Sequence, residues 1–94
     1  MSETVATRVR IHGRVQGVWY RGWAVDEARA LGLSGWVRNR RDGSVEAVFA
    51  GAEPAVRRMI ERCRQGPPSA RVSRLDEQPE TAPVEPGFRQ LPTV

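Results

Sequence analysis

Residues 7–31, TRVRIHGRVQGVWYRGWAVDEARAL, change their hydrophobic period once, and this change predicts a strand, a loop and a helix in succession. Residues 7–12 alternate apolar and polar side chains, which is the period of a half-buried strand. Residues 13–20 contain two glycines and no regular period, which is typical of a loop. Over residues 21–31 the apolar positions recur at helical spacing, and Gly32 is suited to end the helix.

The rest of the chain predicts the same kinds of element in a definite order. The pair Asp42-Gly43 is a hairpin signal, because Gly accepts the positive φ that a tight turn requires. The remaining predicted elements are strands over 34–39 and 44–50, a helix from Pro54 to a stop at Gly66-Pro67-Pro68, a strand over 70–76, a surface loop over 78–87 and a short closing strand over 88–91.

This order of elements, βαββαβ with a short closing strand, predicts the fold class. It is the α+β, ferredoxin-like α/β sandwich, in which two helices cover one face of an antiparallel sheet of four to five strands. In the first strand Val9 and Ile11 should face the helices, while Arg8, Arg10 and His12 should face solvent.

Length, N-terminus and cysteine content indicate a small cytoplasmic domain. The chain of 94 residues has room for one core, so we predict a single domain over 1–94 with a flexible N-terminal segment over 1–6. No apolar run approaches the roughly 20 residues that span a bilayer, and the first residues do not have the pattern of a signal peptide. Cys63 is the only cysteine, whereas small secreted domains usually depend on disulfides.

The charged residues exclude several kinds of chemistry. All 15 basic residues are Arg, so Schiff-base formation by Lys and a P-loop lysine are both excluded. One His and one Cys cannot build a usual zinc site, so no cofactor is expected, although a carboxylate-only magnesium site stays formally open. The net charge of +4 suits small anions or nucleic acid.

Two places in the chain could carry phosphate chemistry. The glycines of residues 13–21 allow successive backbone N–H groups to turn toward one point at a helix N-terminus, where Arg21 could grip an anion. A tight turn with a surface Arg explains the same residues equally well. Asn39, at the end of a predicted strand, could hold a water molecule, although taken alone it is better explained as a cap on the strand end.

These residues resemble the two signatures of the acylphosphatase family. The run Gly13-Arg14-Val15-Gln16-Gly17-Val18-Trp19-Tyr20-Arg21 resembles the first signature, Gly-x-Val-Gln-Gly-Val-x-aromatic-Arg. The second is resembled by Gly35-Trp36-Val37-Arg38-Asn39 with Asp42-Gly43-x-Val45-Glu46 and Gly51. Later landmarks of the family are resembled by Gly66-Pro67, Ala70-x-Val72 and Phe88, so the resemblance runs from about Arg10 to Leu91.

The resemblance implies a function and a role for each matching residue. It implies metal-free hydrolysis of the carboxyl–phosphate bond of small acyl phosphates, with inorganic phosphate as a product inhibitor, by a monomer without nucleic-acid or membrane partners. The phosphate-gripping arginine is Arg21 and the water-orienting asparagine is Asn39. The amides that cradle the phosphate belong to Val15, Gln16, Gly17, Val18, Trp19 and Tyr20. Tyr20 stands where the family usually has Phe, so its hydroxyl needs a partner or an exit to solvent.

Two other functions use the same fold. An RNA-binding module would stack bases on aromatic residues of the open sheet face. The positions expected there on the first and third strands hold no aromatic residue; they are Arg8, Arg10, His12, Glu46, Val48 and Ala50. A non-catalytic regulatory domain would not need Arg21 and Asn39. We also expect a surface role for His12, a buried thiol at Cys63 and a loop-tip position for Trp19.

Overall fold

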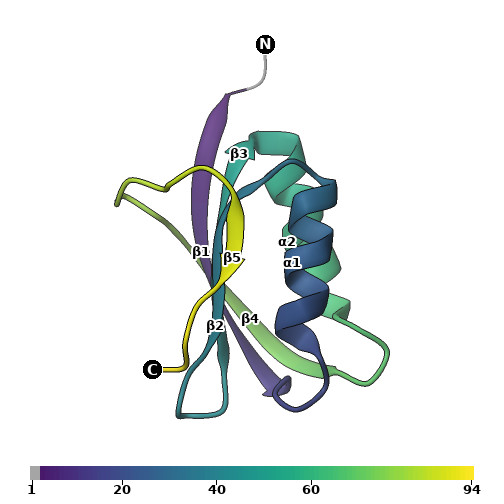
Figure 1. Ribbon diagram of the computed structural model, residues 1–94. Coiled ribbons are helices and arrows are strands. Elements are labelled where there is room, and N and C mark those ends of the chain that lie inside the picture. Colours follow the sequence, from purple (N-terminus) through teal and green to yellow (C-terminus); the bar gives the residue numbers. More distant parts are fainter. Residues whose placement is uncertain (1–2) are drawn as a thin grey trace.

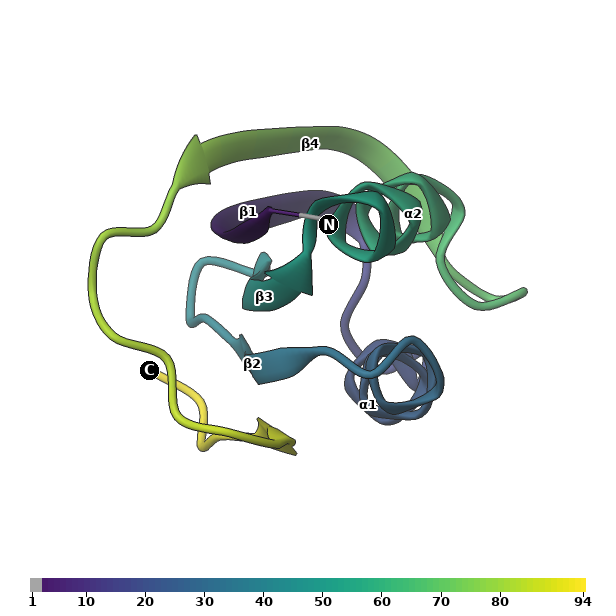
Figure 2. The ribbon, with the colours of Figure 1, turned by 90° about the horizontal axis from the view of Figure 1, so that it is seen from above.

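The computed structural model describes residues 3–94 as a mixed β-sheet with two helices on one face (Figure 1). The view from above places α1 and α2 on the same side of the sheet (Figure 2). The elements are β1 (Thr4–Arg14), α1 (Tyr20–Ala30), β2 (Ser34–Asn39), β3 (Val45–Ala52), α2 (Glu53–Gln65), β4 (Arg71–Pro79) and β5 (Phe88–Gln90). The predicted ferredoxin-like α+β fold is confirmed.

The sheet has the strand order β4-β1-β3-β2-β5, and its closing strand runs in the direction that was not expected. The pairs β1–β4, β1–β3 and β2–β3 are antiparallel, but β5 pairs with β2 in parallel, with Gly35 opposite Phe88. The prediction of a wholly antiparallel sheet is therefore wrong at β5. The reason is topological: β4 and β2 run in opposite directions, so a chain that reverses after β4 and crosses to the far edge must run with β2.

The N-terminal strand is longer than the sequence predicted. It begins at Thr4, which pairs with Ala52 of β3. The expected flexible segment over residues 1–6 is therefore wrong from Thr4 onward, while residues 1 and 2 lie outside the described part of the chain. The strand extends because β3 itself runs on to Ala52 and supplies backbone partners along this length.

The predicted surface loop is two residues shorter than expected. Gln78 and Pro79 belong to β4 and pair with Arg8 and Thr7 of β1, so the loop covers residues 80–87. Proline is tolerated at this position because β4 is an edge strand, whose outer side needs no backbone donor.

The core lies between the sheet and the helices, as the alternation in β1 predicted. Val9 and Ile11 are fully buried and face this layer. The buried residues of α2 are Val56, Met59, Ile60 and Cys63, spaced at helical intervals. The thiol of Cys63 is thus buried, and burial raises its pKa to about 12, so it is a packed side chain at neutral pH.

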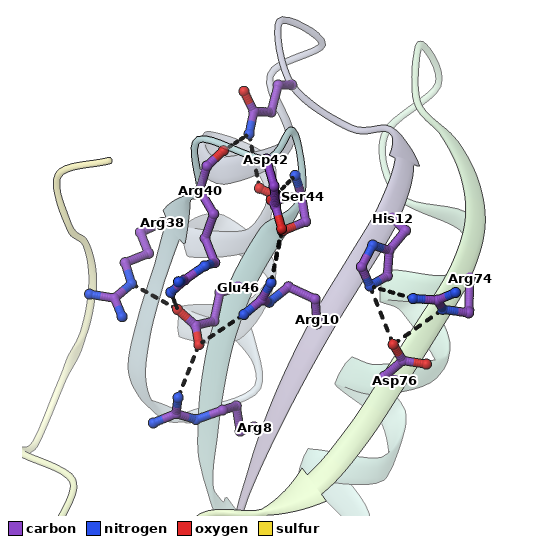
Figure 3. Close-up of polar contacts among 11 residues, drawn as sticks. Arg8, Arg10, His12, Arg38, Arg40, Asp42, Ser44, Glu46, Arg74 and Asp76 are labelled. Atoms are coloured by element: carbon purple, nitrogen blue, oxygen red, sulfur yellow. Dashed lines mark hydrogen bonds and ion pairs between the residues drawn. The ribbon is translucent and has the colours of Figure 1, made fainter. Parts of the chain in front are cut away.

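The opposite face of the sheet is covered by an ionic cluster (Figure 3). Glu46 of β3 is 1% exposed and lies among four arginines. Its oxygens lie 2.9 Å from Arg38 Nε, 3.0 Å from Arg40 Nη1, 3.0 Å from Arg8 Nη1 and 3.9 Å from Arg10 Nη2. Arg8 and Arg10 therefore occupy the predicted face, but they are half-buried and paired.

Two further residues on this face also have partners that the sequence did not reveal. His12, for which a surface role was expected, is half-buried, and its Nε2 lies 3.3 Å from Oδ2 of Asp76, which β4 brings beside it (Figure 3). The guanidinium of Arg38 lies over the half-buried ring of Trp36 in β2, with its Cζ 4.6 Å from the centre of the Trp36 ring. Arginine side chains thus occupy the surface on which an RNA-binding sheet would present free aromatic rings.

Candidate active site

The segment between β1 and α1 turns sharply into the helix. Gly17 has φ 73°, and Trp19, the N-cap residue of α1, has φ 67° and ψ 25°. Trp19 is the one non-glycine residue with positive φ among residues 3–94. Its carbonyl nevertheless accepts the first helical bond from Trp23 N at 3.1 Å, so the helix starts directly after this left-handed residue.

Tyr20 anchors the end of this segment in the core. Its ring is 2% exposed, and its hydroxyl donates to the carbonyl of Cys63 at 2.6 Å. This carbonyl belongs to the last turn of α2, whose final carbonyls have no partner within the helix. Burial raises the pKa of the Tyr20 hydroxyl, so the group stays a neutral donor. The tyrosine that departs from the usual phenylalanine therefore bonds α1 to the end of α2.

Gln16 ties the same segment to the β2–β3 hairpin. Its Nε2 donates to the carbonyls of Arg40 at 2.7 Å and Ser44 at 2.9 Å. The side chain of a residue that the sequence assigned only a backbone role thus fixes the distance between the loop and the end of β2.

Asn39 is the last residue of β2 and is 8% exposed. Its backbone carbonyl accepts a bond from Val94 N at 3.1 Å, and Arg41 N donates to Val94 O at 2.7 Å. Its side-chain Oδ1 is buried and has no hydrogen-bond partner among residues 3–94. The strand end is therefore held firmly, while one buried acceptor is left without a protein donor.

The loop, Arg21 and Asn39 line one cleft of about 260 Å³. Its lining residues are Val15, Gln16, Gly17, Trp19, Tyr20, Arg21, Gly22, Asn39 and Gln90. Sequence analysis had selected all of these except Gly22 and Gln90. Gly22 could have been suspected from its place beside Arg21, whereas Gln90 reaches the cleft through the parallel pairing of β5, which no sequence signal indicated. Val18, which was also selected, packs in the core and does not line the cleft.

Arg21 differs from the arginines of the opposite face. It is half-buried in the cleft and makes no side-chain hydrogen bond or ion pair with any of residues 3–94, although Glu46 alone engages four arginines. A guanidinium at the N-terminus of a helix is unfavourable next to the positive end of the helix dipole. The combination suits an anion that would lie between them.

Two other hollows in the described part of the chain lack this combination. One of about 330 Å³ lies between β1, β4 and α2, and another of about 380 Å³ lies over the ionic cluster. Neither is lined by Arg21 or Asn39. No three His, Cys, Asp or Glu side chains within residues 3–94 form a group that could hold a metal ion. We therefore take the cleft of about 260 Å³ that is lined by Arg21 and Asn39 as the candidate active site.

Comparison with known proteins identifies the family. The acylphosphatase family model matches residues 7–90. The chain belongs to the acylphosphatase family. It is 62% identical over 86 residues to an acylphosphatase of Rhodospirillum rubrum, covering 92% of this chain and 94% of that protein. It is 52% identical over 92 residues to an acylphosphatase of Rhizorhabdus wittichii, covering 98% and 93%.

Solved acylphosphatase structures have the same fold. The structure from Coxiella burnetii superposes with a TM-score of 0.89 at 32% identity, covering 94% of this chain and 93% of that one. The structure from Bacillus subtilis gives 0.87 at 32% identity, covering 93% and 98%. The chain is thus a hydrolase of acid anhydrides whose substrates are small acyl phosphates, and the RNA-binding and regulatory alternatives are not favoured. No helix within residues 3–94 is long and apolar enough to cross a membrane.

Proposed function

We propose that the cleft holds the phosphoryl group of an acyl phosphate between the backbone of Val15–Tyr20 and Arg21, and that Asn39 aims the attacking water. The observation that carries this proposal is the buried, unpartnered Oδ1 of Asn39 in the same cleft as an unpaired arginine. A buried acceptor without a donor destabilises a fold by about 1–3 kcal/mol, so its retention is understandable if a water donates to it during the reaction.

The chemistry follows from the groups that meet there. Arg21 binds two phosphoryl oxygens with its planar fork and lowers the energy of charge that develops on them. The Asn39 oxygen accepts an O–H of the water and directs a lone pair at phosphorus. The new P–O bond forms as the bond to the carboxyl oxygen breaks, and the carboxylate leaves with the electron pair. A phosphate oxygen takes the proton from the water.

This scheme needs neither a protein acid nor a metal ion. A carboxylate is a weak base and a good leaving group, so position and charge stabilisation are enough. Inorganic phosphate, the product, should occupy the same site and inhibit competitively. We further propose a monomer in the cytoplasm without a nucleic-acid partner. Among residues 3–94 the exposed large apolar side chains are Trp19 and Val94, whereas subunit interfaces usually bury larger apolar surfaces, which supports the monomer.

The test compares two lysine variants. Arg21→Lys keeps the charge but loses the two-point grip, so kcat/KM should fall about 10- to 100-fold, the range for loss of a charge-assisted hydrogen bond. The inhibition constant of phosphate should rise in parallel, and the increase in melting temperature with phosphate should largely disappear. Arg14→Lys is the matched control, because Arg14 is an exposed arginine at the end of β1 that does not line the cleft. Equal behaviour of the two variants would indicate a diffuse positive patch and reject the role of Arg21.

A further inference from the structure

The mouth of the cleft carries one large apolar surface, the indole of Trp19. This side chain is 63% exposed although it lines the cleft together with Arg21 and Asn39. The next residue, Tyr20, is buried in the core and packs edge-on against Trp23 at 5.2 Å between ring centres. The indole therefore follows directly from a segment whose next residue is anchored in the core, and the indole itself is not needed to fill that core.

Two features of the backbone near the indole are unfavourable for the stability of the fold. Trp19 is held in the left-handed region, which is unfavourable by on the order of 1–3 kcal/mol for a non-glycine residue and tends to occur at functional sites. Gly22, in the first turn of α1, destabilises a helix by about 1 kcal/mol relative to Ala.

The glycine allows a close contact with the indole. A Cβ at position 22 would overlap Nε1 of the Trp19 indole and lie 2.8 Å from its Cδ1. The indole thus lies against the backbone of Gly22, and only glycine leaves room for it. Gly22 is directly next to Arg21, so the indole is fixed beside the proposed phosphate clamp.

We propose that Trp19 is a specificity-determining residue that binds the acyl group, and that the enzyme prefers aromatic or bulky apolar acyl phosphates to small ones. The inference rests on the proposed function, because it takes the phosphoryl group to lie at Arg21. The carboxyl carbon and its substituent then extend from the clamp toward the mouth of the cleft, where the indole is the large apolar surface. A flat acyl group gains an offset-stacked or edge contact there, while an acetyl group is too short to cover the ring.

The test measures kcat/KM for benzoyl phosphate and acetyl phosphate in the same variants. Trp19→Asn removes the indole and suits the left-handed backbone, which Asn tolerates better than most residues. It should lower the benzoyl-to-acetyl ratio of kcat/KM about 3- to 10-fold, the range for one aromatic contact. Trp19→Phe should retain most of the ratio. Gly22→Ala should lower the ratio as well, because its Cβ displaces the indole.

The double variant Trp19→Asn with Gly22→Ala supplies the decisive comparison. Once the indole is absent, Gly22→Ala has nothing to displace, so the ratio should fall no further than in Trp19→Asn alone. An unchanged ratio in Trp19→Asn, or additive losses in the double variant, would overturn the inference. Arg21→Lys in the same assay should lower the rates with both substrates, so failure of the phosphate clamp is distinguished from failure of the acyl contact.

Discussion

Replacing Glu46 with Gln tests how much the ionic cluster on the open sheet face contributes to stability. Oε1 of Glu46 accepts from Arg38 and Arg40, and Oε2 accepts from Arg8. Gln offers one oxygen and one NH2 group, so one set of arginine donors would face another donor. The charge that balances these arginines is lost at the same time.

The expected loss of unfolding free energy in Glu46→Gln lies between the values for buried and exposed ion pairs. Removing one partner of a fully buried ion pair destabilises a protein by about 3–5 kcal/mol, whereas exposed pairs contribute about 0–1. The Glu46 side chain is 2% exposed, but the arginine side chains around it are 24–35% exposed and keep part of their hydration. We therefore expect Glu46→Gln to lower the free energy of unfolding by about 2–3 kcal/mol, or the melting temperature by about 10–15 °C for a chain of this length.

The stability difference between wild type and Glu46→Gln should also depend on pH. Burial alone would raise the pKa of Glu46, but the hydrogen bonds from Arg38 and Arg40 outweigh it, so the pKa is lowered below the ordinary value of 4.5. A carboxylate whose pKa is lower in the folded state than in the unfolded state contributes its full stabilisation at any pH above its unfolded-state pKa. That contribution is lost as the pH falls through the folded-state pKa. The difference between wild type and Glu46→Gln should thus be full at pH 7 and shrink below about pH 4.5.

Urea unfolding at pH 7 and at pH 3–4 measures both conditions. The matched control is Glu61→Gln, whose side chain is 75% exposed and lies 3.4 Å from Arg64, and which should change stability by less than about 0.5 kcal/mol. A Glu46→Gln variant as stable as this control, or a difference that grows in acid, would refute the reasoning.

Three further predictions concern the site and its support. Tyr20→Phe leaves the buried carbonyl of Cys63 without its donor, so urea unfolding should show a loss of about 1–2 kcal/mol; a variant as stable as wild type would show that this bond contributes nothing. Asn39→Ala should reduce kcat by on the order of 10²–10³ while competitive inhibition by phosphate changes little, and near-normal turnover would assign the water to another group. Dialysis against a strong chelator should leave the rate unchanged; a loss restored by magnesium or zinc would contradict the metal-free scheme.

Local periodicity predicted the elements that depend on one face being buried. The bounds of β2 agree with the predicted residues 34–39, and α1 begins one residue before the predicted Arg21. The Asp42-Gly43 signal lies in the β2–β3 connection. Sequence did not predict the direction of β5 or the start of β1 at Thr4, because both depend on which distant strand supplies backbone partners rather than on any local pattern.

The burial of Glu46 shows a different limit of sequence analysis. Its alternation with Val45 and Ala47 correctly assigned it to the face away from the helices, and on that basis it was expected to face outward. Alternation determines which face of the sheet a residue is on, but not how deeply it is buried. The extent of burial depends on the side chains that the neighbouring strands place around the residue. Arg10 of β1 and Arg38 of β2 lie directly opposite Glu46 in the two registers, so long side chains from both sides cover a residue that a shorter set would have left in water.

The two faces of the sheet are coupled through the end of β2. Arg38 and Arg40 flank Asn39 in the chain, and both donate to the same oxygen of Glu46 on the open face. Asn39 itself is buried in the cleft, and the carbonyl of Arg40 also accepts from Gln16 in the segment between β1 and α1. A backbone fixed on both sides of one residue leaves that residue's side chain little freedom, which is the condition for aiming a water molecule. The ionic cluster around Glu46 therefore also helps to hold the backbone from which the side-chain amide of Asn39 projects.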